Sequence, residues 1–285
     1  MVAVRYLAAL VWMLAVPLPS RSGAELDEGR TAQASLFAQS ASEALIRDFS
    51  SPGISYLLLD ARTDEVLASR WANADSPIAL GSLAKPFTAL AYGEQHSFRY
   101  PLHTCRGTAS GCWRPGGHGQ VDLTSAIAYS CNSYFRMLTT ELTAAEVMET
   151  VARFGIEGPD SGVSGAELAG LGARWQISPL RMARAYLELV RQRERPAVKQ
   201  ILDGMARSAR QGTGAELDRA LQRETGLVKT GTTACTHQPH APGDGFSVAM
   251  VPADNPRLLL MVRVHGVPGS HAAKTAGQML RRIED

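Results

Sequence analysis

The chain has 285 residues, of which 45% are hydrophobic and 20% are charged, so it has enough apolar material for one large globular domain or two small ones. Its 29 basic and 27 acidic residues give a formal net charge of +2. A chain so close to neutral lacks the concentrated positive charge by which proteins bind nucleic acids or anionic membrane surfaces. We therefore expect no nucleic-acid partner.

The N-terminus has the pattern of a secretory signal. Arg5 precedes an apolar run over residues 6–16, which is about half of the ~20 residues needed to span a bilayer. Small residues follow, and Ala24 is the expected last residue before a cleavage site. We expect residues 1–24 to be a cleaved signal peptide, with an uncleaved N-terminal anchor as the alternative, and residues 25–285 to form a single exported domain.

Four cysteines fit an exported protein, because disulfide bonds form in oxidising compartments. Cys105 and Cys112 lie seven positions apart in a glycine-rich segment. A bridge between them would contribute roughly 2–3 kcal/mol by reducing the entropy of the unfolded chain. Cys131 and Cys235 lie apart from this pair. Four cysteines allow three pairings, and the sequence does not choose among them.

Metal binding has weak support in the sequence. Cys235, His237 and His240 have a spacing compatible with ligands, but no fourth ligand follows at a suitable distance, so we interpret them as a loop and predict no metal site. Cys131 is expected to be a small core residue, and His118 to brace a loop through hydrogen bonds.

The expected elements place strands at both ends of the chain and helices between them. Helices are predicted over residues 25–50, from 82 onward, 122–140 with an interruption near 130, 143–154, 178–195, 196–209 and 271–283. Strands are predicted over residues 54–60, 65–71, 226–233, 245–251 and 258–265. Residues 73–80, 97–120 and 158–172 are predicted to be loops. This order predicts an α+β domain whose sheet joins N- and C-terminal strands, with a helical insert.

Ser82 and Lys85 stand three residues apart, which places them on one face of a helix. A hydroxyl is a poor nucleophile at neutral pH and needs an adjacent base, and an amine that is kept partly neutral can serve. Pro86 is tolerated only in a first turn, so the helix must begin close to Ser82. Ser82 therefore lies at a helix N-terminus, where free N–H groups favour negative charge.

Two further triplets follow in order, Ser-Cys-Asn at residues 130–132 and Lys-Thr-Gly at residues 229–231. With Ser-x-x-Lys they make up the signature set of serine acyl transferases. Gly231 would let a substrate approach a strand closely, and Lys229 would supply a cation for a substrate carboxylate. Three ordered motifs point to acyl-transfer chemistry far more specifically than any one of them.

On these residues the sequence resembles the transpeptidase domain of penicillin-binding proteins, in the superfamily that includes the serine β-lactamases. Residues 81–88, Gly-Ser-Leu-Ala-Lys-Pro-Phe-Thr, resemble that family's first motif. Residues 117–123 and 130–135 are similar to elongation-type class B members. Three features depart from the family. This sequence lacks the long non-catalytic N-terminal region of class B proteins, it shows no evident uncleaved membrane span, and Gly-Leu-Gly-Ala-Arg-Trp at 170–175 replaces the usual Gly-Gln-Gly.

The resemblance implies a β-lactamase-like fold, with an antiparallel sheet of N- and C-terminal strands flanked by helices. It implies that Ser82 attacks a D-Ala–D-Ala peptide carbonyl and forms an acyl-enzyme, with Lys85 as the base. Ser130 would relay the proton to the leaving amine, and Asn132 would orient Lys85 and the substrate amide. A base near neutral pH requires the Lys85 pKa to fall by about 3 units, or roughly 4–5 kcal/mol. Burial and the charge of Lys229 could supply that difference.

The same resemblance assigns substrate binding to the Lys-Thr-Gly strand. Lys229 and Thr230 would hold the substrate carboxylate, and Gly231 would allow close approach. Backbone N–H groups of Ser82 and Thr232 would form an oxyanion hole, in which each donor is worth ~3 kcal/mol.

Three functions compete on the sequence alone. The first is a bacterial D,D-transpeptidase or carboxypeptidase, exported to the periplasm or the outer face of the cytoplasmic membrane. It would act on peptidoglycan stem peptides without a cofactor, be inhibited by β-lactams, and have other cell-wall synthesis proteins as partners. The second is a serine β-lactamase, although the chain has no Glu-x-x-Leu-Asn motif for deacylation. The third is a non-catalytic domain that binds muropeptides or senses β-lactams.

Overall fold

The computed structural model describes residues 23–222, 224–235 and 240–284, with side chains described from residue 35 onward. The chain divides into two units, Met1–Phe37 and Ala38–Asp285, and helix α1 (Gly23–Asp48) crosses their boundary. The expected signal peptide lies almost entirely outside the described residues. None of the described helices combines the length and hydrophobicity needed to cross a membrane.

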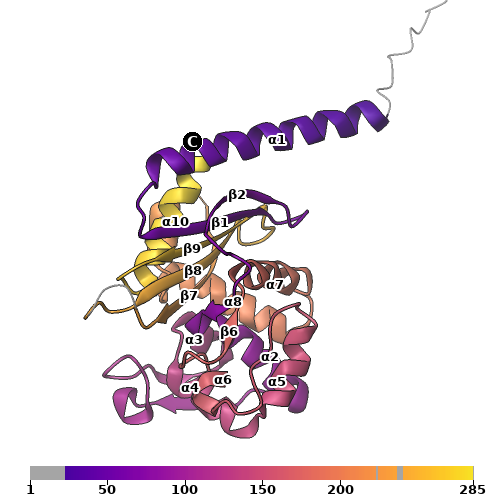
Figure 1. The fold of residues 1–285 in the computed structure, drawn as a ribbon. Helices are drawn as coiled ribbons and strands as arrows, with labels where there is room; N and C mark the ends of the chain where they lie inside the picture. Colours follow the sequence, from indigo (N-terminus) through magenta and orange to yellow (C-terminus); the bar gives the residue numbers. More distant parts are fainter. Residues whose placement is uncertain (1–22, 223, 236–239, 285) are drawn as a thin grey trace, which may run out of the picture. The chain divides into compact units, whose positions relative to one another are not determined.

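The second unit is built on a five-stranded sheet in the order β2-β1-β9-β8-β7, with every neighbouring pair antiparallel. Its strands are β1 (Ile54–Asp60), β2 (Val66–Arg70), β7 (Leu227–Thr233), β8 (Asp244–Val251) and β9 (Leu258–Val264). Strands from the two ends of the sequence meet where β1 pairs with β9, with Tyr56 opposite Val262 (Figure 1). The predicted α+β fold with a sheet of N- and C-terminal strands is confirmed.

Both faces of the sheet are covered, because alternate residues of each strand enter two separate cores. Tyr56 and Leu58 pack into a core with α10 (Gly269–Glu284), and Leu57 and Leu59 pack into a larger core with the helical insert. A strand that is buried on both faces needs apolar residues at successive positions, which explains its uninterrupted leucines.

The insert between β2 and β7 consists of short helices: α2 (Lys85–Gln95), α3 (Leu123–Ala128), α4 (Asn132–Leu138), α5 (Ala144–Ala152), α6 (Gly165–Leu168), α7 (Pro179–Arg191), α8 (Pro196–Gln211) and α9 (Glu216–Leu221). Capping residues mark the first turns of two helices, at the positions where the sequence predicts those helices to begin. Ser178 caps α7, and Thr143 forms a reciprocal capping box with Glu146 at α5. Gly155 ends the α5 segment in the left-handed conformation.

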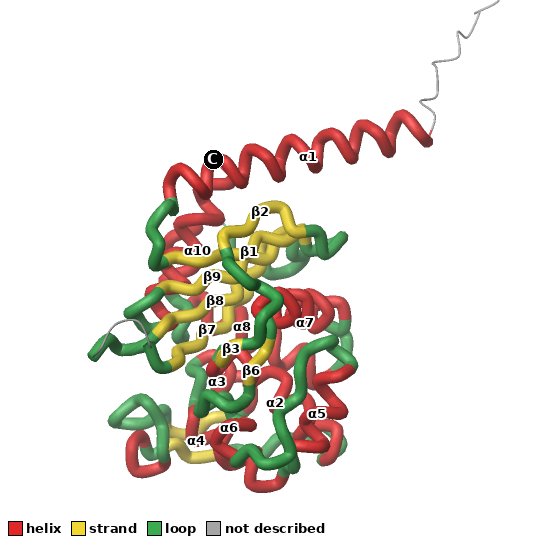
Figure 2. The backbone as a smooth tube through the Cα atoms, viewed as in Figure 1, coloured by secondary structure: helices red, strands yellow, loops and turns green. Residues whose placement is uncertain are grey.

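Short elements were not predicted. Residues 97–120, expected to be a loop, contain a hairpin of β4 (His103–Cys105) and β5 (Gly119–Val121). A second small ladder joins β3 (Ile78–Ala79) to β6 (Gln176–Ile177), and Figure 2 shows these strands in front of the helical insert. Two- and three-residue ladders are too short to produce a detectable hydrophobic period, so only tertiary contacts define them.

Candidate active site

Ser82 lies in a single 3₁₀ turn, η1 (Gly81–Ala84), which leads into α2. Ser82 and Lys85 therefore straddle a 3₁₀–α junction instead of sharing one α-helix, with Pro86 in the first turn as expected. The turn packs directly on strand β7. A Cβ atom on Gly231 would lie 2.6 Å from the Leu80 carbonyl oxygen, so only glycine fits there. This close approach brings the backbone of Ser82 beside that of the Lys-Thr-Gly strand.

The Lys85 ammonium is completely buried and is held by the second motif. Its Nζ atom donates to Asn132 Oδ1 at 2.6 Å, to the Ser130 carbonyl oxygen at 3.0 Å and to Ser130 Oγ at 3.3 Å. Burial lowers the pKa of Lys85 to about 7, because removal from water disfavours the charged form. Within the described part of the chain the Ser82 hydroxyl makes no hydrogen bond, and Ser82 lines the pocket. A free hydroxyl thus precedes, by three residues, an amine that is partly neutral at physiological pH.

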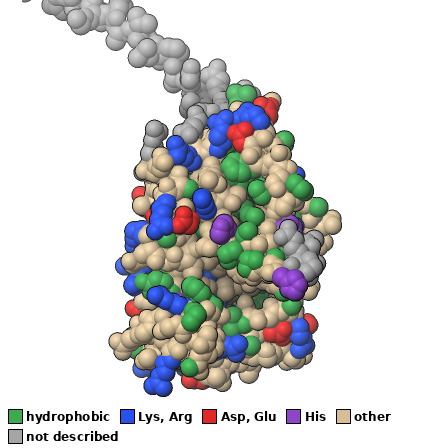
Figure 3. Space-filling view, turned by 90° about the vertical axis from the view of Figure 1, so that its left-hand side faces the viewer, with side chains coloured by type: hydrophobic (Ala, Val, Ile, Leu, Met, Phe, Trp, Pro, Cys, Tyr) green, Lys and Arg blue, Asp and Glu red, His purple; other side chains and the backbone are tan. Residues whose placement is uncertain are grey.

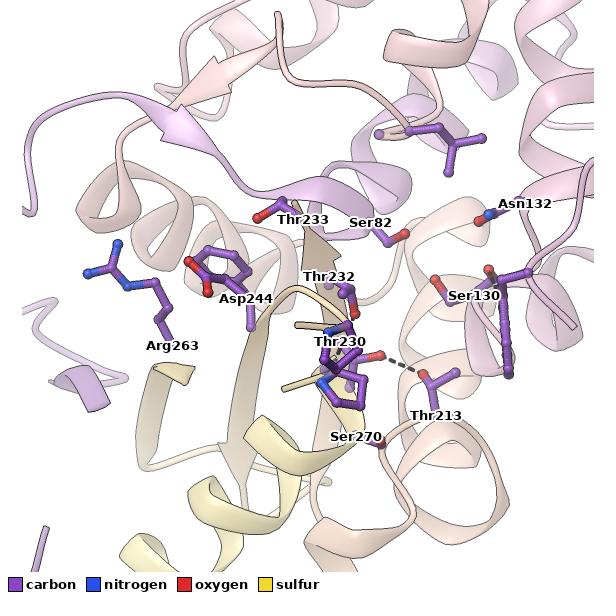
Figure 4. Close-up of a pocket in the computed structure, with 18 of the residues that line it drawn as sticks. Ser82, Ser130, Asn132, Thr213, Thr230, Thr232, Thr233, Asp244, Arg263 and Ser270 are labelled. Carbon is purple, nitrogen blue, oxygen red and sulfur yellow. Dashed lines mark hydrogen bonds between the residues drawn. The ribbon is translucent and has the colours of Figure 1, made fainter. Parts of the chain in front are cut away.

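Ser130 occupies a strained position between α3 and α4, with a φ of 48°. Left-handed conformations cost energy in residues other than glycine and concentrate at functional sites. The strain places Ser130 Oγ between two lysines, 3.3 Å from Lys85 Nζ and 3.0 Å from Lys229 Nζ. Figure 4 shows Ser82 from η1 facing Ser130 and Asn132, which come from the turn before α4 and the start of that helix.

Lys229 is buried on β7 and does not line the pocket. Its Nζ atom donates to Ser130 Oγ and, at 2.8 Å, to the Thr230 carbonyl oxygen. Burial lowers the pKa of Lys229 well below its usual value, and the neighbouring Lys85 charge lowers it further. The structure thus brings this predicted carboxylate ligand to Ser130, while Thr230, Gly231 and Thr232 form the pocket wall.

The pocket has a volume of about 1390 Å³ and lies between the Lys-Thr-Gly strand and the helical insert. Figure 3 shows a hollow at mid-height on one face of the molecule, with hydrophobic side chains on either side. Residues 170–173 line it, so the loop that departs from the family pattern borders the site.

Two pocket residues had no role in the sequence-based interpretation. Thr213 Oγ1 lies 2.6 Å from Thr230 Oγ1 and accepts its hydrogen bond (Figure 4). Trp113 is half-exposed at the rim, and its Nε1 atom donates to the Ser130 carbonyl oxygen at 3.2 Å. Thr213 carries no local signal by which the sequence could have identified it.

The carboxylates on the pocket wall are already engaged. Among the described lining residues these are Glu216, which pairs with Arg219, and Asp244. Asp244 accepts hydrogen bonds from His265 Nδ1 at 2.9 Å and from the Gly266 amide at 3.1 Å. In Figure 4, Asp244 lies on the opposite side of Thr232 from Ser130.

All four cysteines have free thiols, so none of the pairings that the sequence left open is formed in this structure. The sulfur atoms of Cys105 and Cys112 are turned toward His118 Nδ1, each at 3.5 Å. Cys131 is separated from this pair in the sequence, but its sulfur atom lies 3.9 Å from the sulfur atom of Cys112. The β4–β5 hairpin, which the sequence patterns did not predict, explains this proximity, because it folds the segment with Cys105 and Cys112 back onto the second motif. The alternative cluster on residues 235–240 includes His237, which lies outside the described residues.

Comparison with known proteins identifies the family of this chain. The sequence model of the penicillin binding protein transpeptidase domain matches residues 54–284. The chain belongs to this family. The match begins at β1 and ends in α10, and so includes the complete sheet and all three motifs. No curated protein matches the sequence.

Solved structures show the same fold. Pseudomonas aeruginosa PBP2 in complex with WCK 5153 is 17% identical with a TM-score of 0.69, covering 87% of this chain and 76% of that chain. The apo transpeptidase domain of Burkholderia pseudomallei penicillin-binding protein 3 is 17% identical with a TM-score of 0.64, covering 89% and 92%. Helicobacter pylori PBP2 in complex with MreC is 15% identical with a TM-score of 0.72, covering 85% of this chain and 62% of that chain.

Proposed function

We propose that this penicillin-binding transpeptidase domain is an exported bacterial D,D-transpeptidase that forms an acyl-enzyme at Ser82 with D-Ala–D-Ala stem peptides of peptidoglycan. The observation that carries the proposal is the state of Lys85. A fully buried amine with a pKa of about 7, fixed by Ser130 and Asn132 and three residues from a free serine hydroxyl, is a poised general base. β-Lactams would acylate the same serine.

The reaction proceeds in two half-steps. Neutral Lys85 takes the Ser82 hydroxyl proton as the Ser82 oxygen bonds to the penultimate D-alanine carbonyl carbon. Collapse of the tetrahedral intermediate breaks the peptide bond, and the leaving D-alanine amine takes the Ser130 hydroxyl proton. Ser130 is reprotonated from Lys85, to which it is hydrogen bonded. An acceptor amine then attacks the ester and releases Ser82.

Negative charge on the carbonyl oxygen develops beside the contact between η1 and β7. The backbone N–H groups of Ser82 and Thr232 are the donors that the family resemblance assigns to it. The terminal carboxylate of the stem peptide binds the hydroxyl groups of Thr230, Thr232 and Thr213. Lys229 acts on this end of the substrate through Ser130, because its ammonium is buried behind the pocket wall.

Deacylation by water in the manner of class A β-lactamases needs a free carboxylate, and the described residues of the pocket wall offer none. Glu216 and Asp244 are both held by neighbouring groups, as described above. An acyl-enzyme at Ser82 is therefore expected to persist until an amine arrives, which favours a transpeptidase over a serine β-lactamase. Its partners are the stem peptides and other proteins of cell-wall synthesis.

Labelling with a fluorescent penicillin tests the proposal. The full chain should form a covalent adduct that survives denaturation, and mass spectrometry should place it on Ser82. Ser82→Ala should abolish the adduct, whereas Ser76→Ala, which changes an exposed serine in the preceding loop, should label normally. Incubation with a D-Ala–D-Ala pentapeptide should release D-alanine, and an added D-amino acid should appear in the product.

The alternatives give different results. Rapid loss of the adduct with hydrolysis of the antibiotic would identify a β-lactamase. A stable adduct without D-alanine release would identify a β-lactam sensor. Absence of any adduct would identify a non-catalytic binding domain and overturn the proposal.

A further inference from the structure

The pocket continues beyond the groups that take part in acyl transfer. Its volume of about 1390 Å³ exceeds the roughly 300–1,000 Å³ that is typical of sites for one small ligand. Asp244 and Arg263 line this further part. Figure 4 shows both residues on the opposite side of Thr232 from Ser130. Because Ser130 serves the leaving amine in the proposed reaction, this part of the pocket faces the portion of the substrate that stays attached to Ser82.

The register of the sheet places Arg263 in line with the Lys-Thr-Gly strand. Gly231 on β7 is opposite Phe246 on β8, and Phe246 is opposite Arg263 on β9. Neighbouring strands lie about 4.8 Å apart, so the Arg263 backbone is roughly 10 Å from Gly231 across the sheet. Opposite residues share one face of a sheet, and Phe246 packs into the core on the side of the helical insert. Arg263 therefore projects from the same face of the sheet as the active site.

Arg263 is fixed by neighbouring side chains and has no counter-ion among the described residues. Its guanidinium carbon lies 5.2 Å from the centre of the Trp71 ring, and its Nη2 atom donates to Ser55 Oγ at 3.1 Å. Its Nε atom is buried without a hydrogen-bond partner in the described chain. Burial lowers the pKa of Arg263, because removal from water disfavours the charged form. A partly buried cation of this kind is stabilised when an anion joins it.

Asp244 adds a negative charge to the same part of the pocket. It is held by His265 Nδ1 at 2.9 Å and by the Gly266 amide at 3.1 Å. Its charge raises the pKa of Arg263 against the effect of burial, so the two groups lie within electrostatic range of each other. A purely anionic ligand would be repelled by Asp244, and a purely cationic ligand would be repelled by Arg263. A ligand that carries both charges close together matches this pair.

We propose that Arg263 and Asp244 bind the side-chain end of the residue that precedes D-Ala–D-Ala, where that end carries an amine and a carboxylate on one carbon. The inference rests on the proposed function and names the class of stem peptide that this chain accepts. Arg263 binds the carboxylate, with which a guanidinium forms two parallel hydrogen bonds, and Asp244 attracts the ammonium. A lysine-type side chain supplies only the ammonium and leaves Arg263 without an anion.

The reach of such a side chain agrees with the position of Arg263. Each residue of an extended peptide spans about 3.5 Å, so the third residue begins roughly 4–5 Å from the scissile carbonyl, and a side chain of four carbons carries its end to roughly 10 Å. Gly231 lies beside η1, where the carbonyl is attacked, and Arg263 begins two strand spacings away. The carboxylate therefore reaches the guanidinium while the scissile carbonyl lies at Ser82.

Pentapeptides that differ at one residue test this subsite. A peptide with meso-diaminopimelate at the third position should release D-alanine with a kcat/KM about 10- to 100-fold above two others, one with L-lysine and one with diaminopimelate whose side-chain carboxylate is amidated. Arg263→Gln should abolish this preference. Arg263→Lys should recover part of it, because lysine keeps the charge but lacks the planar fork. Arg62→Gln, which changes an exposed arginine outside the pocket, should keep the full preference.

Binding measurements separate the subsite from catalysis. Ser82→Ala cannot be acylated, so isothermal titration calorimetry with this variant measures the affinity for each peptide without turnover. We expect the same order of affinities, and its loss when Arg263→Gln is added. The amidated peptide keeps the test decisive if Arg263→Gln fails to fold, because it removes the carboxylate from the ligand and leaves the protein unchanged.

The outcomes distinguish this inference from the proposed function. Equal affinity and turnover for the three peptides, or an equal loss for all three in Arg263→Gln, would overturn the subsite and leave the transpeptidase activity standing. Affinities in the expected order without D-alanine release would support the subsite and count against the proposed function alone. Absence of binding by all three peptides would overturn both.

Discussion

At the scale of single residues, the site depends on two buried lysines that share one hydroxyl. Lys85 and Lys229 both donate to Ser130 Oγ, and neither has a carboxylate partner among the hydrogen bonds of the described residues. Burying an ammonium without a counter-ion is costly, and a protein can reduce that cost by deprotonating the group. The energy spent on burial thus supplies a neutral amine at physiological pH, which an exposed lysine would not provide.

The rate of acylation should therefore follow the ionisation of Lys85. Its pKa is lowered from 10.5 to about 7, so the reactive neutral form is lost as pH falls through 7 and predominates above it. The second-order rate constant for fluorescent penicillin should fall about tenfold per pH unit below pH 7 and level off above it. Stopped-flow measurements from pH 5 to pH 9 would check this. A flat profile across that range would rule out Lys85 as the base.

At the scale of elements, the contact between η1 and β7 aligns the nucleophile with the substrate-binding strand. Gly231 permits that contact on β7, and Gly81, with a φ of 57°, permits it on the turn. Neither residue touches the reacting bond. Both set the separation of two backbone N–H groups, which must be correct for the oxyanion to be stabilised.

Gly231→Ala should separate η1 from β7, because the new Cβ would lie 2.6 Å from the Leu80 carbonyl oxygen. We expect a destabilisation of about 1–3 kcal/mol from overpacking and a larger loss of acylation rate, on the order of 10²-fold. Urea unfolding and penicillin labelling would measure the two effects. Gly53→Ala is the matched control, since its Cβ would meet only ordinary contacts. Equal labelling rates in the two variants would contradict this role for Gly231.

At the scale of the whole second unit, one sheet separates two cores. The core on the α10 side contains no motif residue, and the larger core on the other side supports the active site. Because β1, β8 and β9 contribute alternate residues to both cores, damage to one core should destabilise the other. The unit should therefore unfold in a single transition.

Met279→Ala tests this coupling from the far side of the sheet. Met279 is fully buried on α10, and its truncation should cost about 2–5 kcal/mol. Loss of penicillin labelling and loss of helical circular dichroism should then occur at the same, lower urea concentration. Gln278→Ala, at an exposed position on the same helix, should leave the midpoint unchanged. Separate midpoints for the two signals would show that the cores unfold independently.

The sequence by itself determined the long elements, the order of the motifs and the fold class. Leu57 and its neighbours read as a strand because burial on both faces demands consecutive apolar residues, and Thr143 marks a helix start because capping is a local interaction. The Ser82 and Lys85 pair could be assigned because residues three positions apart in a helical segment lie on the same face.

Only the tertiary structure decided how distant residues meet. The direction of Lys229 toward Ser130, the pairing of Thr230 with Thr213, and the gathering of Cys105, Cys112 and Cys131 around His118 all depend on segments that are separated in the chain. The directions of these side chains follow from the packing of three irregular segments, which are the η1 turn, the short β4–β5 hairpin and the strained turn at Ser130. Such features leave no periodic pattern, because contacts between elements hold them in place.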